Sequence, residues 1–127
     1  MSIAPVTGSA FARAARMDVR EITRRLNAAL GATLVGALAG SKDPKISYKW
    51  AQHDGPAPKS ASVQRLQFAF TQWLAIAEVE GEQVARMWFI GSNPWLDQDT
   101  PVDAIREGRF KETAAAAAAM IDDGFTG

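Results

Sequence analysis

The sequence predicts an all-α fold with an N-terminal helix-turn-helix lobe followed by a C-terminal helical lobe. Apolar residues recur at helical spacing along most of the chain, and glycines and prolines fall between these periodic stretches. Six consecutive alanines, at 114–119, favour helix strongly. A chain of 127 residues forms one domain, or two small lobes that share a core. We expect a flexible tail over 1–8, a helix-turn-helix-like lobe over 9–60 and a second helical domain over 61–127.

The first predicted helix is rich in arginine and runs from residue 9 to about residue 25. Four arginines three or four positions apart share one face of it, namely Arg13, Arg16, Arg20 and Arg24. This stripe could lie on phosphate, on an acidic neighbour or in solvent. An apolar side of the same region is expected to be buried, and it consists of Ile22, Leu26, Ala29 and Leu30.

The next predicted elements are two short helices joined by a turn. An apolar helix over 32–39 ends at Gly40, and Pro44 opens a second helix that reaches His53. The arrangement is similar to a helix-turn-helix, whose second helix enters the major groove of DNA. The side chains that would contact DNA are Lys42, Lys45, Ser47, Tyr48, Lys49 and Gln52.

The phase of this second helix is open by about one residue. Ile46 and Trp50, four positions apart, are expected to face the core. Many helix-turn-helix sequences instead place the two core residues three apart, and in this chain Ser47 occupies that position. An alternative is a structural remnant of the motif that no longer binds DNA.

The longest predicted helix covers residues 59–79 and links the two lobes. Its apolar stripe, which includes Leu66, Phe70 and Trp73, is interpreted as core, and Phe68 lies off that face. An acidic joint around Gly81 precedes a helix that begins at Glu82, where negative charge favours a helix N-terminus.

Residues 88–110 form the most informative stretch of the chain. Asn93-Pro94 must bend the backbone, because proline fixes φ and biases the preceding residue away from helix. Thr100 suits an N-cap, Pro101 the first helical position and Asp103 the end of a capping box. Gly108 is expected to stop this short helix in a left-handed conformation, and the final helix follows over 110–122.

This stretch resembles the C-terminal domain of the Xre/MbcA/ParS antitoxin family. The residues that carry the resemblance are Asn93-Pro94, Trp95-Leu96, Thr100-Pro101, Asp103 with Ile105, and Gly108-Arg109-Phe110. The resemblance covers about the last half of the chain. It implies a type II antitoxin that binds and occludes a RES-type, NAD-consuming toxin and represses its own operon through operator DNA.

The resemblance also divides the C-terminal residues into two groups. The expected toxin contacts are Arg109, Phe110, Met120, Ile121, Phe125, Thr126 and Gly127. The residues expected to shape the domain rather than touch the partner are Asn93, Pro94, Trp95, Thr100, Pro101 and Gly108.

The charges of the chain are divided between its halves. Residues 1–65 hold ten basic and four acidic residues, and residues 66–127 hold four basic and ten acidic residues. This asymmetry indicates two partners of opposite charge, or an attraction between the halves within one fold or across a dimer.

An enzymatic function is not expected. The chain has no cysteine, and His53 is its single histidine, so neither a thiolate site nor a histidine cluster for a metal can form. The glycines match no phosphate-binding pattern, and no cofactor is expected. No secretory signal or membrane-spanning stretch is evident, and we expect a cytoplasmic protein.

The sequence therefore predicts an antitoxin that forms a homodimer within a larger complex with its toxin. One alternative is a dimeric helix-turn-helix transcriptional regulator without a toxin partner, and another is a structural adaptor that inhibits no toxin.

Overall fold

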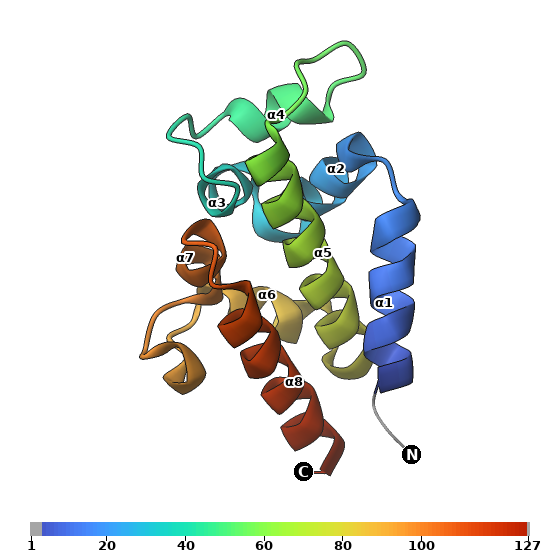
Figure 1. The fold of residues 1–127 in the computed structure, drawn as a ribbon, viewed down its shortest axis with the longest axis vertical. Helices are drawn as coiled ribbons and strands as arrows, with labels where there is room; N and C mark the ends of the chain where they lie inside the picture. The colour runs from blue at the N-terminus through green and yellow to red at the C-terminus, as the bar shows by residue number, and fades with distance from the viewer. Residues whose placement is uncertain (1–3, 127) are drawn as a thin grey trace.

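The computed structural model describes the backbone of residues 4–126 and the side chains of residues 9–123. This part of the chain is all-helical, as predicted, and contains no strand (Figure 1). The elements in order are α1 (Ala4–Arg16), α2 (Val19–Leu30), α3 (Ala32–Leu38), α4 (Ile46–Ala51), α5 (Ser60–Glu80), α6 (Glu82–Ile90), the 3-10 helix η1 (Pro94–Leu96), α7 (Pro101–Arg106) and α8 (Phe110–Thr126).

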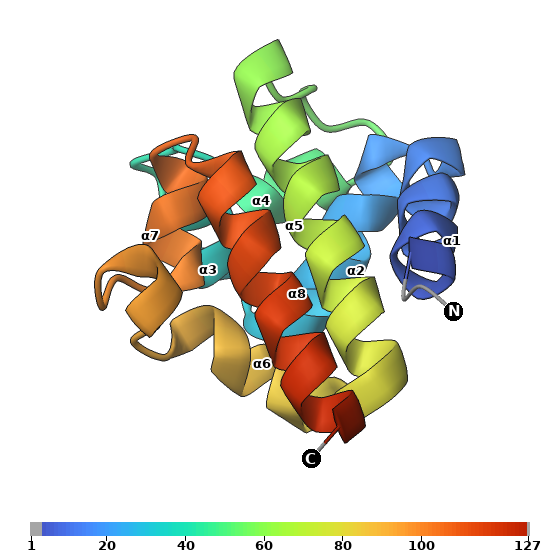
Figure 2. The ribbon, with the colours of Figure 1, turned by 60° about the horizontal axis from the view of Figure 1, so that its bottom comes forward.

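The long helix α5 is the centre of the packing. It lies between α1 and α8, and it also contacts α2, α6 and α7 (Figures 1 and 2). Leu66, Phe70 and Ile76 on α5 are fully buried, as the apolar stripe predicted for Leu66 and Phe70. Trp73 is only partly buried.

One hydrophobic core runs through both predicted lobes. Among the described side chains, its buried members run from Ala10 in α1 to Ile121 in α8. The short helix α3 packs against α7, which lies more than sixty residues further along the chain. The N-terminal and C-terminal halves are thus joined by shared apolar burial, the main stabilising term in folding.

The arginine-rich region is two helices and not the single helix predicted. The first helix ends at Arg16, and Asp18 caps the second with its carboxylate, which accepts from the backbone N–H of Arg20. An extended residue at the N-cap is the ordinary way to start a new helix, and it changes the direction of the chain. The four arginines therefore do not form one continuous stripe. The first helix, α1, begins at Ala4, within the segment expected to be a flexible tail.

Two short helices end at glycines, as the sequence predicted. Gly40 after α3 and Gly108 after α7 have φ values of +92° and +78°, a region that glycine enters without steric cost. After α7, Gly108 N–H donates to Ile105 and Arg109 N–H donates to Ala104, the two bonds of a Schellman motif. The left-handed glycine thus turns the chain sharply from α7 into α8.

None of the described helices combines the length and the apolar character that crossing a bilayer requires.

Candidate functional site

The predicted helix-turn-helix region exists as α3, a loop over 39–45, and α4. Ser47 is fully buried, and its hydroxyl donates to the carbonyl of Ala32 at the start of α3, at 2.9 Å. Trp50 is also buried, whereas Ile46 is only partly buried. The buried pair of α4 is therefore Ser47 and Trp50, three apart, and Ile46, expected to face the core with Trp50, is partly buried and packs against that core. Ser47 cannot contact DNA from this position.

The other predicted DNA contacts are exposed on α4 and on the segments beside it. They are Lys42, Lys45, Tyr48, Lys49 and Gln52. Asp43 lies among them, with a carboxylate oxygen 3.9 Å from the Lys49 ammonium and another accepting from the Lys45 backbone at 2.9 Å. The helix spans Ile46–Ala51, shorter than the predicted helix from Pro44 to His53. This surface offers positive charge, but over a short helix and with one carboxylate inside it.

Two arginines of the predicted stripe hold the end of α4. Arg20 donates to the backbone carbonyls of Trp50 at 3.3 Å, Gln52, and Gly55 at 2.8 Å, and Arg24 donates to Ala51 at 3.2 Å. The carbonyls of Trp50, Ala51 and Gln52 lie at the C-terminal end of α4, where cations interact favourably with the helix dipole, and that of Gly55 lies in the turn beyond it. The charge run could not identify this role, because the acceptors lie about thirty residues away in the sequence.

A tight corner follows α6 and contains η1. Asn93 organises it, because its side-chain oxygen accepts from Trp95 N–H at 2.9 Å and its carbonyl accepts from Leu96 and Gln98 N–H, both at 2.9 Å. The N–H of Asn93 donates to the carbonyl of Asp99 at 3.0 Å, which closes the loop. Asn93 thus shapes the domain, as expected from the sequence.

Two consecutive residues of this corner, Asp97 and Gln98, have positive φ values of 55° and 71°. Side chains other than glycine enter this region at a steric cost, although aspartate and asparagine tolerate it best. No feature of the sequence indicated such a conformation at Gln98.

The start of α7 agrees with the prediction. The Thr100 hydroxyl accepts from the Asp103 backbone at 3.1 Å, and Pro101 occupies the first helical position, where it is buried. Pro94 opens η1 in the same way, but it is exposed.

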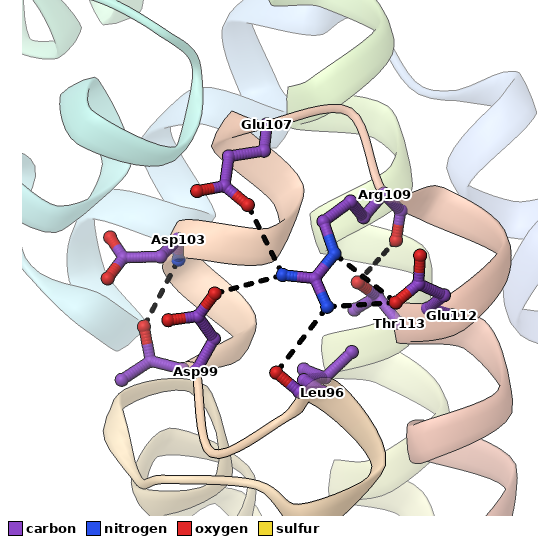
Figure 3. A network of polar contacts seen from close by, with 8 residues as sticks. Leu96, Asp99, Asp103, Glu107, Arg109, Glu112 and Thr113 are labelled. Atoms are coloured by element: carbon purple, nitrogen blue, oxygen red, sulfur yellow. Dashed lines mark hydrogen bonds and ion pairs between the residues drawn. The ribbon is translucent and has the colours of Figure 1, made fainter.

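Arg109 lies at the centre of a polar network that joins the corner, α7 and α8 (Figure 3). Its guanidinium contacts Asp99 at 2.9 Å, Glu107 at 3.2 Å and Glu112 at 2.8 Å. It also donates to the backbone carbonyl of Leu96 at 3.4 Å. The hydrogen bond from Arg109 lowers the pKa of Glu112, and the carboxylates raise the pKa of Arg109 further above its ordinary value, Glu112 first. The side chain of Arg109, which was expected to contact the toxin, therefore forms ion pairs and hydrogen bonds within its own chain.

The remaining predicted toxin contacts differ in exposure. Phe110 is partly buried, with its ring 4.7 Å from that of Phe68. Met120 packs against the core, and Ile121 is buried in it, so the prediction that Ile121 touches a partner was wrong. The side chains of Phe125 and Thr126, and all of Gly127, lie outside the described residues.

Trp95 departs from its predicted role. It was expected to shape the domain, but it is 61% exposed at the tip of η1. The adjacent Leu96 is fully buried and supplies the apolar anchor instead. Periodicity could not distinguish the two residues, because η1 is a single turn with no repeat to read.

Within the described part of the chain, no group of three or more His, Cys, Asp or Glu side chains could hold a metal ion. His53 is almost fully exposed, 3.9 Å from the Asp54 carboxylate.

No family model, no curated protein and no solved structure matches this chain.

Proposed function

We propose that this protein is a non-enzymatic antitoxin that binds a RES-type toxin and occludes its nucleotide cleft. The proposal starts from the resemblance of residues 93–110 to the Xre/MbcA/ParS antitoxin family. Supporting it, the short elements implied by that resemblance are formed: a corner capped by Asn93, a helix opened by Thr100-Pro101 and a stop at Gly108. Inhibition by contact requires no covalent chemistry and no cofactor.

The observation that carries the proposal is the change in burial near the end of α8. Ile121 is buried in the core, whereas Asp122 and Asp123, one and two positions later, are exposed. The end of α8 lies at the edge of the molecule in both ribbon views (Figures 1 and 2). Because α8 is held in the core up to Ile121 and then reaches the edge of the molecule, its terminal residues can enter the nucleotide cleft of a toxin. The terminal residues in this role would begin at Asp122.

The charge of the C-terminal half supports the same kind of partner. Residues 66–127 hold ten acidic and four basic residues, so a toxin with a basic rim would be attracted to this half. Such complementarity raises the association rate more than the affinity.

The test is co-expression and co-purification with the product of the adjacent reading frame, followed by measurement of NAD depletion. The full chain should form a complex and prevent depletion. A chain that lacks residues 123–127 should lose inhibition while its circular dichroism stays helical, because it keeps Ile121, the last core residue among those that the structure describes. Full inhibition by the truncated chain would refute occlusion by the terminal residues.

The second candidate function is a dimeric transcriptional regulator, either as part of the antitoxin or in place of it. The exposed cations Lys42, Lys45 and Lys49 around α4 favour it. Electrostatic contact with phosphate gives binding that weakens as salt increases.

A gel-shift titration with promoter DNA at several salt concentrations tests this candidate. Lys45→Glu with Lys49→Glu should abolish the shift. The matched control, Lys59→Glu with Lys111→Glu, makes the same change of net charge at two exposed sites outside α4 and should preserve it. Absence of any shift at low salt would leave toxin binding as the sole function proposed.

A further inference from the structure

We propose that Trp95 is the anchor by which this chain docks on its protein partner, inserting into an apolar pocket that is bordered by lysine or arginine. This inference rests on the proposed antitoxin function, because it takes the toxin as that partner. It names a contact that the resemblance assigned to the shape of the domain alone.

The first argument is the exposure of a large aromatic side chain at a fixed place. Trp95 is 61% exposed, although the neighbouring Leu96 is fully buried, and Trp95 is one of five exposed large hydrophobic residues among those that the structure describes. Tryptophan is enriched among the few residues that supply most of the energy of protein interfaces.

The second argument is rigidity. The backbone N–H of Trp95 donates to the Asn93 side chain. The carbonyl of the following residue, Leu96, accepts from the Asp99 N–H at 3.0 Å and from the Arg109 guanidinium at 3.4 Å. The indole is therefore presented from a backbone that is fixed before binding. Preorganisation of this kind reduces the entropy lost on association.

The third argument is the backbone conformation beside the indole. Asp97 and Gln98 hold positive φ values in succession, a conformation that costs free energy for residues with side chains. The backbone hydrogen bonds of Asn93 to Gln98 and Asp99 maintain it, together with the Arg109–Asp99 ion pair that Figure 3 shows. Such conformations cluster at binding sites, where the surrounding structure maintains them for function.

The negative charge around Trp95 favours a basic protein partner over a second copy of this chain. Residues 93–112 contain five acidic and three basic residues, and the basic residue at the centre, Arg109, is already in ion pairs with Asp99, Glu107 and Glu112. Asp97 and Asp103 are exposed in addition. A second copy of the chain would bring like charges together at this corner, which is unfavourable. A basic border around an apolar pocket complements both the indole and the carboxylates.

The chain contains a matched control for the indole. Tyr48 on α4 is 59% exposed, is also aromatic, and belongs to the opposite, basic half of the sequence. Trp95→Ala and Tyr48→Ala therefore remove similar exposed aromatic area from two different surfaces. Neither side chain is part of the core, so both variants should fold, and thermal unfolding verifies this.

The experiment measures the dissociation constant of each variant for the toxin by calorimetry, and separately measures inhibition. Trp95→Ala should weaken binding by at least about thirty-fold, the loss typical of an interface hot spot, whereas Tyr48→Ala should change it by no more than about two-fold. Equal affinities of the two variants would overturn the inference while leaving the antitoxin function standing. Absence of binding by the unmodified chain would overturn both.

A charge variant tests the border of the pocket. Asp97→Asn keeps a residue type that tolerates positive φ, and together with Asp103→Asn it removes two exposed carboxylates. The double variant should associate more slowly at low salt and show a weaker dependence on salt. An unchanged association rate would overturn the basic border.

Discussion

The hydroxyl of Ser47 donates to the carbonyl of Ala32 inside the protein, joining α4 to the first residue of α3. This bond fixes the rotation of α4, because Ser47 and Trp50 then face the core and Tyr48 and Lys49 face outward. A one-residue difference in phase therefore decides which side chains a nucleic acid or a protein could meet.

Ser47→Ala should destabilise the protein by about 1 kcal/mol, because a buried carbonyl loses a hydrogen-bond partner. Urea unfolding measures the change. Ser92→Ala, at an exposed position, is the control and should stay within about 0.5 kcal/mol of the unmodified chain. Equal stability of the two variants would show that the Ser47 bond does not hold α4.

Asn93→Ala should cost about 1 kcal/mol of unfolding free energy, because the N-cap acceptor for Trp95 N–H is lost. Asn93→Asp keeps an oxygen in the same place and should retain most of the stability. The two variants separate the hydrogen bond from the shape of the side chain, and equal losses in both would contradict a capping role.

Ile121→Ala should destabilise the protein by about 2–4 kcal/mol, because it opens a cavity in the core. Lys111→Ala on the same helix removes an exposed side chain and should have little effect. An unchanged free energy of unfolding for Ile121→Ala would mean that Ile121 does not anchor α8 in the core. The exposed end of α8, on which the proposed function depends, would then begin before Asp122.

The Arg109–Glu112 pair predicts a pH dependence. Since the hydrogen bond from Arg109 lowers the folded pKa of Glu112, its contribution to stability is complete above the ordinary glutamate pKa of about 4.3 and is lost as the pH falls through the lower folded value. Glu112→Gln should therefore be less stable than the unmodified chain at pH 7, and the difference should shrink in acid. Thermal melts from pH 7 to pH 3 measure this, and a difference that grows in acid would contradict it.

Arg109→Lys should loosen the corner without unfolding the protein, because an ammonium cannot reproduce the fork that spans Asp99, Glu112 and the Leu96 carbonyl. Amide hydrogen exchange at Leu96, Gln98 and Asp99 should become faster, and exchange in α5 should be unchanged. Uniform acceleration across the chain would indicate global destabilisation instead.

The residues at which the short helices begin and end could be predicted from the sequence. Thr100-Pro101, Gly40 and Gly108 were predicted from their residue types, because caps and left-handed stops depend on groups a few residues apart. The core stripe at Leu66 and Phe70 on α5 followed from periodicity for the same reason.

Tertiary structure decided the contacts and the burial of several charged and aromatic side chains. In the sequence, Arg20 and Arg24 form part of a basic stripe, but in the structure they donate to carbonyls at the end of α4. Arg109 was expected to contact a partner, but in the structure it pairs with three carboxylates of its own chain. Ile121, expected to contact a partner, is buried, and Trp95, expected to shape the domain, is exposed. Helical spacing determines which residues share a face, but only the packing of distant helices determines which face is covered.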